Sequence, residues 1–156
     1  MRGLCSGAAF TTALSNANNL AALCLDLLAG TTSTYTPAIA LPSGPCFVSD
    51  ATTITIMVSG VPFVLTNAYL AATWSGTPAT NLVNGLVRGF ISEADADVTL
   101  LPVDLPLIGG DPLSSLLPGG AGNCSTSRDD RDTGPDGSSG WYCYLNFVAS
   151  ARPCGG

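Results

Sequence analysis

The segment 141–149 constrains the fold most, because it carries no charge and has apolar or aromatic side chains at alternate positions on both of its faces. Its odd-numbered positions are Trp, Cys, Leu, Phe and Ala, and its even-numbered positions are Tyr, Tyr, Asn and Val. Side chains of a β-strand alternate between the two faces of a sheet. We therefore predict a central strand that is covered on both sides.

Two earlier runs predict a pair of neighbouring strands. Residues 53–58 alternate between Thr or Met and Ile or Val, which is the pattern of a half-buried strand, and Ser59-Gly60 predicts a turn after it. The run 63–74 predicts the second strand, with a bulge near Asn67. The side chains expected on one face of this second strand are Val64, Ala68, Leu70, Ala72 and Trp74.

A third apolar run covers residues 82–91 and contains Gly85 and Gly89. Glycines inside a strand mark bulges or places where another part of the chain approaches closely. We expect a third strand here, with one of these two features at each glycine.

Three other segments are predicted to lie outside the sheet. Between residues 11 and 28, apolar residues at helical spacing, with Ser15 as a cap and Gly30 as a stop, predict one N-terminal amphipathic helix. The Thr- and Pro-rich segment 31–45 predicts a loop or a short edge strand. Residues 100–122 combine leucines with prolines and glycine pairs, which excludes a long helix or a central strand. We predict a long Leu/Pro/Gly-rich loop that folds back as a lid with its leucines buried; the alternative is an exposed patch for a partner.

The cysteines indicate disulfides. The chain has six, an even number, with no C-x-x-C pair and no His, which argues against a zinc or redox site. We predict three disulfides among Cys5, Cys24, Cys46, Cys124, Cys143 and Cys154. Disulfides persist in oxidising compartments, so we expect a secreted, periplasmic or cell-surface protein. The first residues lack the apolar core of a signal peptide, which we interpret as the start of a trimmed mature form, and no run reaches the ~18 apolar residues of a membrane span.

These features together predict a mainly β fold. We expect a disulfide-stapled β-sandwich with one N-terminal helix and the long Leu/Pro/Gly-rich loop, forming a single extracellular domain over residues 1–156.

Acidic residues gather in two places. Residues 128–137 contain Asp129, Asp130, Asp132 and Asp136, and residues 92–97 contain Glu93, Asp95 and Asp97. In a strand the three acids of the second group share one face, whereas in a helix only the first and last stack. Calcium takes ~6 to 8 oxygen ligands, which carboxylates in a Gly-containing loop supply, so these seven residues are candidate calcium ligands.

The Asp-rich segment resembles the calcium loops of EF-hand, dockerin and thrombospondin-type repeats over about ten residues. It departs from the EF-hand pattern because Cys143 occupies the place of the final Glu when Asp132 is taken as the first ligand. This excludes an EF-hand and keeps an irregular calcium loop, completed by Glu93, Asp95 or Asp97. The alternative is a simple turn at Pro135-Asp136-Gly137, with Arg128 and Arg131 neutralising the acids.

Charge and missing residue types limit the function. A net charge of -6 argues against nucleic acid as a partner, and the absence of His removes any Ser-His-Asp arrangement. Charged residues make up 10% of the chain, against the roughly 25 to 35% expected of a soluble surface. We therefore expect a non-catalytic secreted or cell-surface structural or adhesion subunit that associates with copies of itself or with another envelope protein. A strand donated from residues 31–36 or 5–14 is one route to such assembly.

Two alternatives stay open. An extracellular carbohydrate- or ligand-binding module would use Trp74, Trp141, Tyr142 or Tyr144 as stacking faces. A carbohydrate-active hydrolase would need two carboxylates from the acidic clusters facing each other across a cleft.

Overall fold

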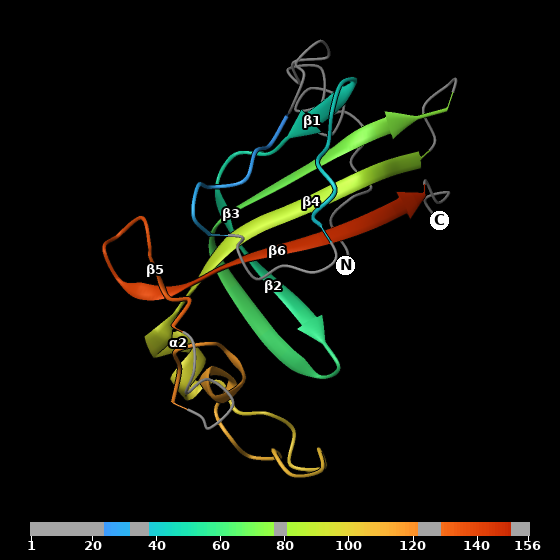
Figure 1. Cartoon of the computed structure of the whole chain (residues 1–156). Helices are drawn as coiled ribbons and strands as arrows, with labels where there is room; N and C mark the ends of the chain where they lie inside the picture. Colours follow the sequence, from blue (N-terminus) through green and yellow to red (C-terminus); the bar gives the residue numbers. More distant parts are fainter. Residues whose placement is uncertain (1–23, 32–37, 77–80, 122–128, 151–156) are drawn as a thin grey trace.

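The computed structural model describes residues 24–31, 38–76, 81–121 and 129–150. Within this part of the chain there are six strands, a short α-helix and a 3-10 helix (Figure 1). They are β1 (Cys46–Val48), β2 (Thr52–Val58), β3 (Val61–Ser75), β4 (Asn81–Ser92), α2 (Glu93–Val98), η1 (Leu113–Leu116), β5 (Asp132–Thr133) and β6 (Ser139–Ser150).

The strands form one antiparallel sheet, curled into a half-barrel, with the order β1-β3-β4-β6-β5. The long strand β3 pairs with β4 along one edge, while its other edge is shared by β2 and then β1. The predicted mainly β fold is confirmed, and the second sheet that the predicted β-sandwich requires does not occur among the described residues. The strand β3, with 15 residues, bends part-way and pairs at both ends of the one curled sheet. The predicted strands at 53–58, 63–74, 82–91 and 141–149 are confirmed.

The bend in β3 is the predicted bulge. Asn67 has a φ of 45°, and the pairing with β4 shifts between Thr66 and Tyr69. The extra residue reverses which side chains face the core: Phe63 and Leu65 do so before the bulge, and Ala68 does so after it. The prediction that Val64 shares a face with Ala68 is therefore wrong.

The two faces of the sheet pack against different segments. On the first face, Leu65, Ile91 and Trp141 form a buried cluster with Ala96 of α2 and the loop residues Leu101 and Leu113. On the second face, Leu86 and Tyr144 pack with Leu25 and other residues of the irregular segments 24–31 and 38–42. The alternation in β6 is confirmed, since Trp141 lies on the first face and Tyr144 on the second. The predicted central position of this strand is wrong, because β5 pairs only with Ser139 and Gly140 and β4 is the one neighbour of the rest of β6 among the described residues.

Residues 24–31 are held on the second face by specific bonds. Arg88 donates to the backbone oxygen of Asp26 over 2.7 Å and lies over the ring of Tyr69. The hydroxyl of Tyr144 accepts from the backbone N–H of Leu28 and bonds to the Thr31 hydroxyl. The predicted helix over 11–28 is corrected at its end, because residues 24–28 are irregular; residues 11–23 lie outside the described part of the chain.

Residues 93–121 form a lobe at one end of the sheet, below β6 in Figure 1. Backbone bonds close it: the N–H of Leu101 donates to Asp111 over 2.9 Å, and the N–H of Leu113 donates to Thr99 over 2.7 Å. The indole N–H of Trp141 donates to the backbone oxygen of Pro118 and fixes the lobe to β6. The predicted long Leu/Pro/Gly-rich loop is this lobe.

Candidate functional site

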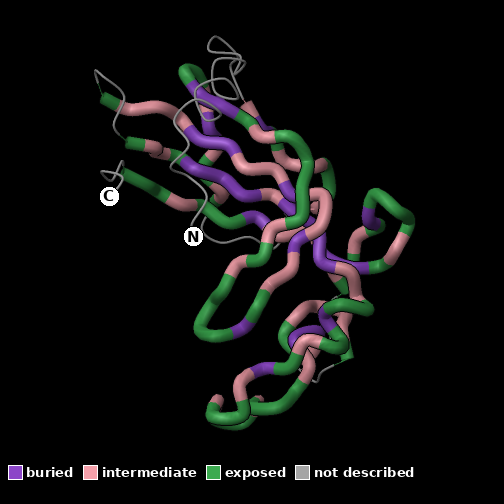
Figure 2. Tube along the Cα trace, turned by 180° about the vertical axis from the view of Figure 1, so that it is seen from behind, coloured by how far each residue is buried: buried purple, intermediate pink, exposed green. Residues whose placement is uncertain are grey.

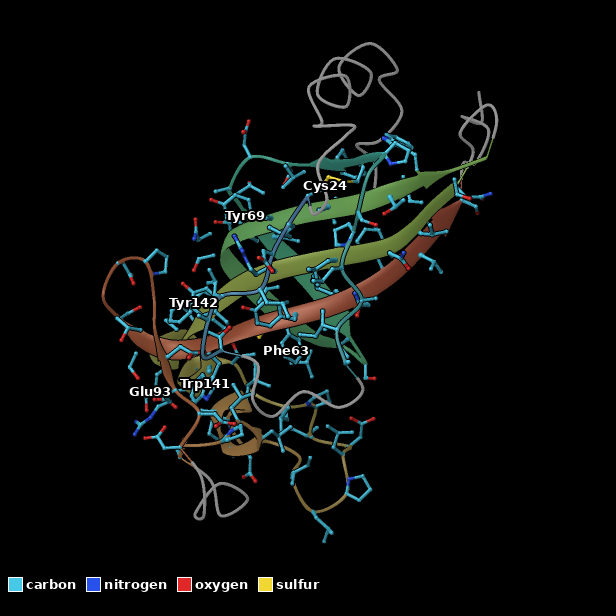
Figure 3. The ribbon with its side chains drawn as sticks, turned by 45° about the horizontal axis from the view of Figure 1, so that its top comes forward. Cys24, Phe63, Tyr69, Glu93, Trp141 and Tyr142 are labelled. Atoms are coloured by element: carbon cyan, nitrogen blue, oxygen red, sulfur yellow. A yellow bond between two sulfur atoms is a disulfide. The ribbon has the colours of Figure 1, made fainter. Side chains whose placement is uncertain are left out.

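The two acidic clusters meet at Arg131. Its guanidinium bonds to Glu93 at 3.0 Å and to both carboxylate oxygens of Asp129, at 2.9 and 2.7 Å. Glu93 begins α2 and lies close to Trp141 at the end of the sheet (Figure 3). The structure thus brings together one acid from each predicted cluster, but an arginine occupies the space between them.

This ion pair sets the charge states of its members. The Arg131 guanidinium, through its hydrogen bonds and charge, lowers the pKa of Asp129 to about 2. The two carboxylates in turn raise the pKa of Arg131. Both groups are therefore fully ionised near neutral pH, and Asp129 is not a general acid.

Three of the other acids form hydrogen bonds that stabilise a helix cap, a turn and a strand. Asp95 completes the cap of α2, since its backbone N–H donates to the Ser92 hydroxyl and its carboxylate accepts from that hydroxyl. Asp136 accepts from the N–H and the hydroxyl of Ser138, which lowers the pKa of Asp136. Asp132 accepts from the N–H of Tyr142 at 3.3 Å, while burial raises its pKa.

These contacts match the turn alternative for the Asp-rich segment. Residues 134–137 form a turn that leads into β6, and the N–H of Gly137 donates to Gly134 at 3.0 Å. Arg131 neutralises Glu93 and Asp129, whereas Arg128 lies outside the described residues. Asp97 is exposed on α2, and Asp130 is half-buried.

No group of three or more acidic, Cys or His side chains suited to a metal ion occurs among the described residues. The reason is that three of the carboxylates have separate partners: Asp95 accepts from the Ser92 hydroxyl, Asp132 from the N–H of Tyr142 and Asp136 from the N–H of Ser138. The calcium site stays a prediction from the sequence.

The cysteines are described in part. Cys24 and Cys46 form a disulfide that ties segment 24–31 to β1. Cys143, which the sequence predicts to be bridged, has a free thiol, and burial raises its pKa to about 11. The predicted pairings of Cys5, Cys124 and Cys154 lie outside the described residues.

The candidate stacking aromatics are mostly covered. Trp141 and Tyr144 are buried, and Trp74 is half-buried with its ring centroid 5.5 Å from that of Phe47. Tyr142 is half-buried and meets Phe90 edge-on. A flat pair of open aromatic rings, which would favour the binding-module alternative, is not formed by these four residues.

The lobe carries five of the ten large apolar side chains that are exposed among the described residues. Its inner leucines, Leu101 and Leu113, are buried as the lid prediction requires. Its outer surface, which we call the apolar lobe surface, instead exposes Val98, Leu100, Val103, Leu107 and Leu116. The exposed character of the lobe is visible in Figure 2, so the lid and the exposed-patch alternatives each describe one side of it.

Leu107 is the most unusual residue of this surface. It is fully exposed and follows Pro106 with a φ of 71°, in the left-handed region that glycine normally occupies. An exposed leucine in a left-handed conformation is unfavourable for both solvation and backbone. Sequence reasoning missed this position, because Pro-Leu shows no sign of a positive φ.

No helix in the described part of the chain is long and apolar enough to cross a lipid bilayer. Comparisons of this chain with protein-family models, with curated proteins and with solved structures find no match.

Proposed function

We propose that this chain is a non-catalytic structural or adhesion subunit, secreted or exposed at a cell surface, that buries its apolar lobe surface against a neighbouring copy of itself. The observation that carries this proposal is Leu107. Backbone conformations that cost ~1–2 kcal/mol persist only where the surroundings or the function require them. A leucine held outward at the tip of a lobe is suited to fill a pocket on a partner.

The surroundings of Leu107 support a preformed contact surface. The backbone N–H of Gly109 donates to Leu105 at 3.0 Å, and that of Gly110 donates to Leu101 at 3.1 Å. A side chain at Gly109 would collide with the backbone oxygen of Val103, at 2.5 Å. The loop tip is therefore tightly folded, and binding through it costs little ordering entropy.

Composition and the disulfide support the same proposal. Exposed apolar groups together with few charges are typical of a surface that becomes covered. The Cys24–Cys46 disulfide fits an oxidising compartment. Two of the carboxylates considered for a hydrolase, Glu93 and Asp129, are engaged by Arg131, which favours the non-catalytic class.

Replacing Leu107 with Gly tests the proposal. We expect a free energy of unfolding equal to or slightly above that of the wild type. Glycine accepts a positive φ, so the substitution relieves ~1 kcal/mol of backbone strain. The greater conformational entropy of glycine in the unfolded chain offsets part of this gain. The apolar anchor is lost, so the average mass measured by light scattering at high concentration should fall. Val103→Ser should act in the same direction.

Val148→Ser is the matched control, because Val148 is similarly exposed but lies on β6 away from the lobe. It should leave the average mass unchanged. A wild-type protein that stays monomeric at every concentration would refute the proposal, as would a Leu107→Gly variant that associates as strongly as the wild type.

A further inference from the structure

Strand β2 lies at an edge of the curled sheet. Within the described residues it pairs only with β3, so its outer side has no strand beside it. The hairpin of β2 and β3 extends from the sheet in Figure 1, and much of it is exposed in Figure 2. Among residues 24–31, 38–76, 81–121 and 129–150, β2 therefore presents a free strand edge.

The side chains of β2 do nothing to protect this edge. Natural proteins protect edge strands with charges, Pro, bulges or very short lengths. β2 has seven residues, Thr-Thr-Ile-Thr-Ile-Met-Val, with no charge, no Pro and no Gly. Uncharged segments of this length and β-propensity pair readily with another strand.

The hairpin turn determines which backbone groups point outward. Ser59 and Gly60 both have a positive φ, at 50° and 86°, as in a two-residue type I′ turn. Val58 and Val61 flank this turn and form the hydrogen-bonded pair that closes it. The pairs alternate from there, so Ile56 and Ile54 also bond to β3, and the N–H and C=O groups of Met57 and Thr55 point to the free edge. The same alternation places those of Thr53 on this edge, next to the shift in register that lies between Thr52 and Ile54.

Pro62 is consistent with this assignment. It lies opposite Met57, in a pair whose backbone groups point away from each other. A proline, which has no N–H, is tolerated there without loss of a bond between β2 and β3.

We infer that β2 pairs antiparallel with β2 of a second copy of this chain, about a two-fold axis at Thr55. In this register Thr55 lies opposite Thr55 of the other copy, and Thr53 lies opposite Met57. Three outward residues on each strand then exchange all their N–H and C=O groups, which makes six hydrogen bonds. Centring the pair on Thr53 or Met57 instead leaves some of these groups unpaired.

The side chains match in the same register. Ile54 lies opposite Ile56 of the other copy, and directly opposed residues project from the same face of a sheet. Ile54 and Ile56 are half-buried and pack against the core cluster of Leu65 and Trp141. Pairing about this two-fold axis therefore places the apolar faces of the two hairpins side by side, as one continuous face. This self-complementarity is what an isologous dimer requires and is the reason for choosing a second copy as the occupant.

The expected dimer is reversible. A typical specific interface has about ten hydrogen bonds, and this pair supplies six. We therefore expect dissociation within the concentration range accessible to sedimentation analysis. The strand edge is a different surface from the apolar lobe surface, so the dimer adds a second contact to the proposed function.

Thr55→Pro tests the strand pairing, with Thr55→Val as its matched control. Proline removes the outward N–H but no bond to β3, whereas valine keeps the N–H and the β-branched shape. In sedimentation velocity over a concentration series, we expect the Thr55→Val protein to dimerise like the wild type. The Thr55→Pro protein should lose the dimer while circular dichroism shows a folded sheet.

A charge exchange tests the position of the two-fold axis and does not depend on whether the proline variant folds. Thr55→Lys and Thr55→Asp each place like charges directly opposite each other in the homodimer, which disfavours pairing. Each variant alone should be shifted to monomer, and an equimolar mixture should recover the dimer. If the mixture fails to recover the dimer, the register is wrong. If each charged variant alone dimerises as strongly as the wild type, the dimer does not form through β2.

Leu107→Gly separates this inference from the proposed function. If both hold, the Leu107→Gly protein forms the β2 dimer and nothing larger, and the Thr55→Lys protein keeps the lobe-dependent association. A Leu107→Gly protein that is monomeric at every concentration would overturn the β2 dimer and leave the lobe proposal in place.

Discussion

At the scale of single residues, Arg131 connects the two acidic segments through ion pairs. Acids that are far apart in the sequence, Glu93 and Asp129, form ion pairs with the same guanidinium. The ion pair is exposed to solvent, where such pairs contribute little to stability. Its effect is to lower the pKa of Asp129 and to hold the carboxylates of Glu93 and Asp129 at one arginine.

The pH dependence of this ion pair is a testable prediction. Asp129 has a pKa of about 2 in the folded protein, below the ~3.9 of an unperturbed Asp in the unfolded chain. Its contribution to the free energy of unfolding is therefore present above about pH 4 and is lost as the pH falls toward 2. We expect Asp129→Asn to lower the melting temperature slightly at pH 7 and to match the wild type near pH 2.

Asp104→Asn, at an exposed position of the lobe, is the control and should not show this convergence. A difference between Asp129→Asn and the wild type that stays constant from pH 7 to pH 2 would contradict the assigned ion pair.

At the scale of elements, the bulge in β3 and the glycines of β4 allow the sheet to curl. A side chain at Gly89 would place its Cβ 2.7 Å from the Cβ of Leu65 and 3.1 Å from that of Ala68. Both of these residues are completely buried. The close approach of β4 to the bend in β3 is therefore possible only with a glycine at this position.

Gly89→Ala should accordingly destabilise the fold. The added methyl group meets two buried side chains that have no free space to move into, and overpacking of this kind costs about 1–3 kcal/mol. Urea denaturation measures the change in the free energy of unfolding. Thr55→Val, at an exposed strand position, should change it by less than about 0.5 kcal/mol. An unchanged free energy in Gly89→Ala would show that β3 and β4 are not this close.

At the scale of the whole molecule, the disulfide joins the second face of the sheet to its cover. Cys24 precedes Leu25, which packs on Leu86 and Tyr144, and Cys46 begins β1. The lobe covers the other face through Trp141. Among the described residues, part of each face of the half-barrel thus packs against a chain segment without regular strands.

Removing the bridge with Cys24→Ser and Cys46→Ser together tests this arrangement. The bridge closes a loop with a sequence separation of 22, and a loop of this size contributes about 3 kcal/mol. We expect a loss of that order in urea denaturation. Hydrogen exchange should accelerate at the amide of Leu28, which bonds to Tyr144, but not at the paired amides of β4 and β6. Equal stability with and without the bridge would contradict this role.

The sequence alone determined the elements of the sheet. The strands, the turn at Ser59-Gly60 and the bulge near Asn67 follow from alternation and from turn residues, because strand geometry places neighbouring side chains on opposite faces whatever the tertiary context. The glycines of β4 were predictable as close contacts for the same local reason. The acids of the candidate site, and the alternative in which Arg131 neutralises them, were also visible in the sequence.

Only the tertiary structure decided how these parts are combined. The described strands form one curled sheet, in which β3 bends at Asn67 and pairs with β2 before the bend and with β1 after it. Pairing between segments that are distant in the sequence decides this arrangement. The partner of Arg131 in α2 and the pairing of Cys24 with Cys46 depend on residues brought together only by folding. The exposure of Leu107 and the free edge of β2 depend on what the rest of the chain leaves uncovered, and periodicity along the sequence carries no information about that.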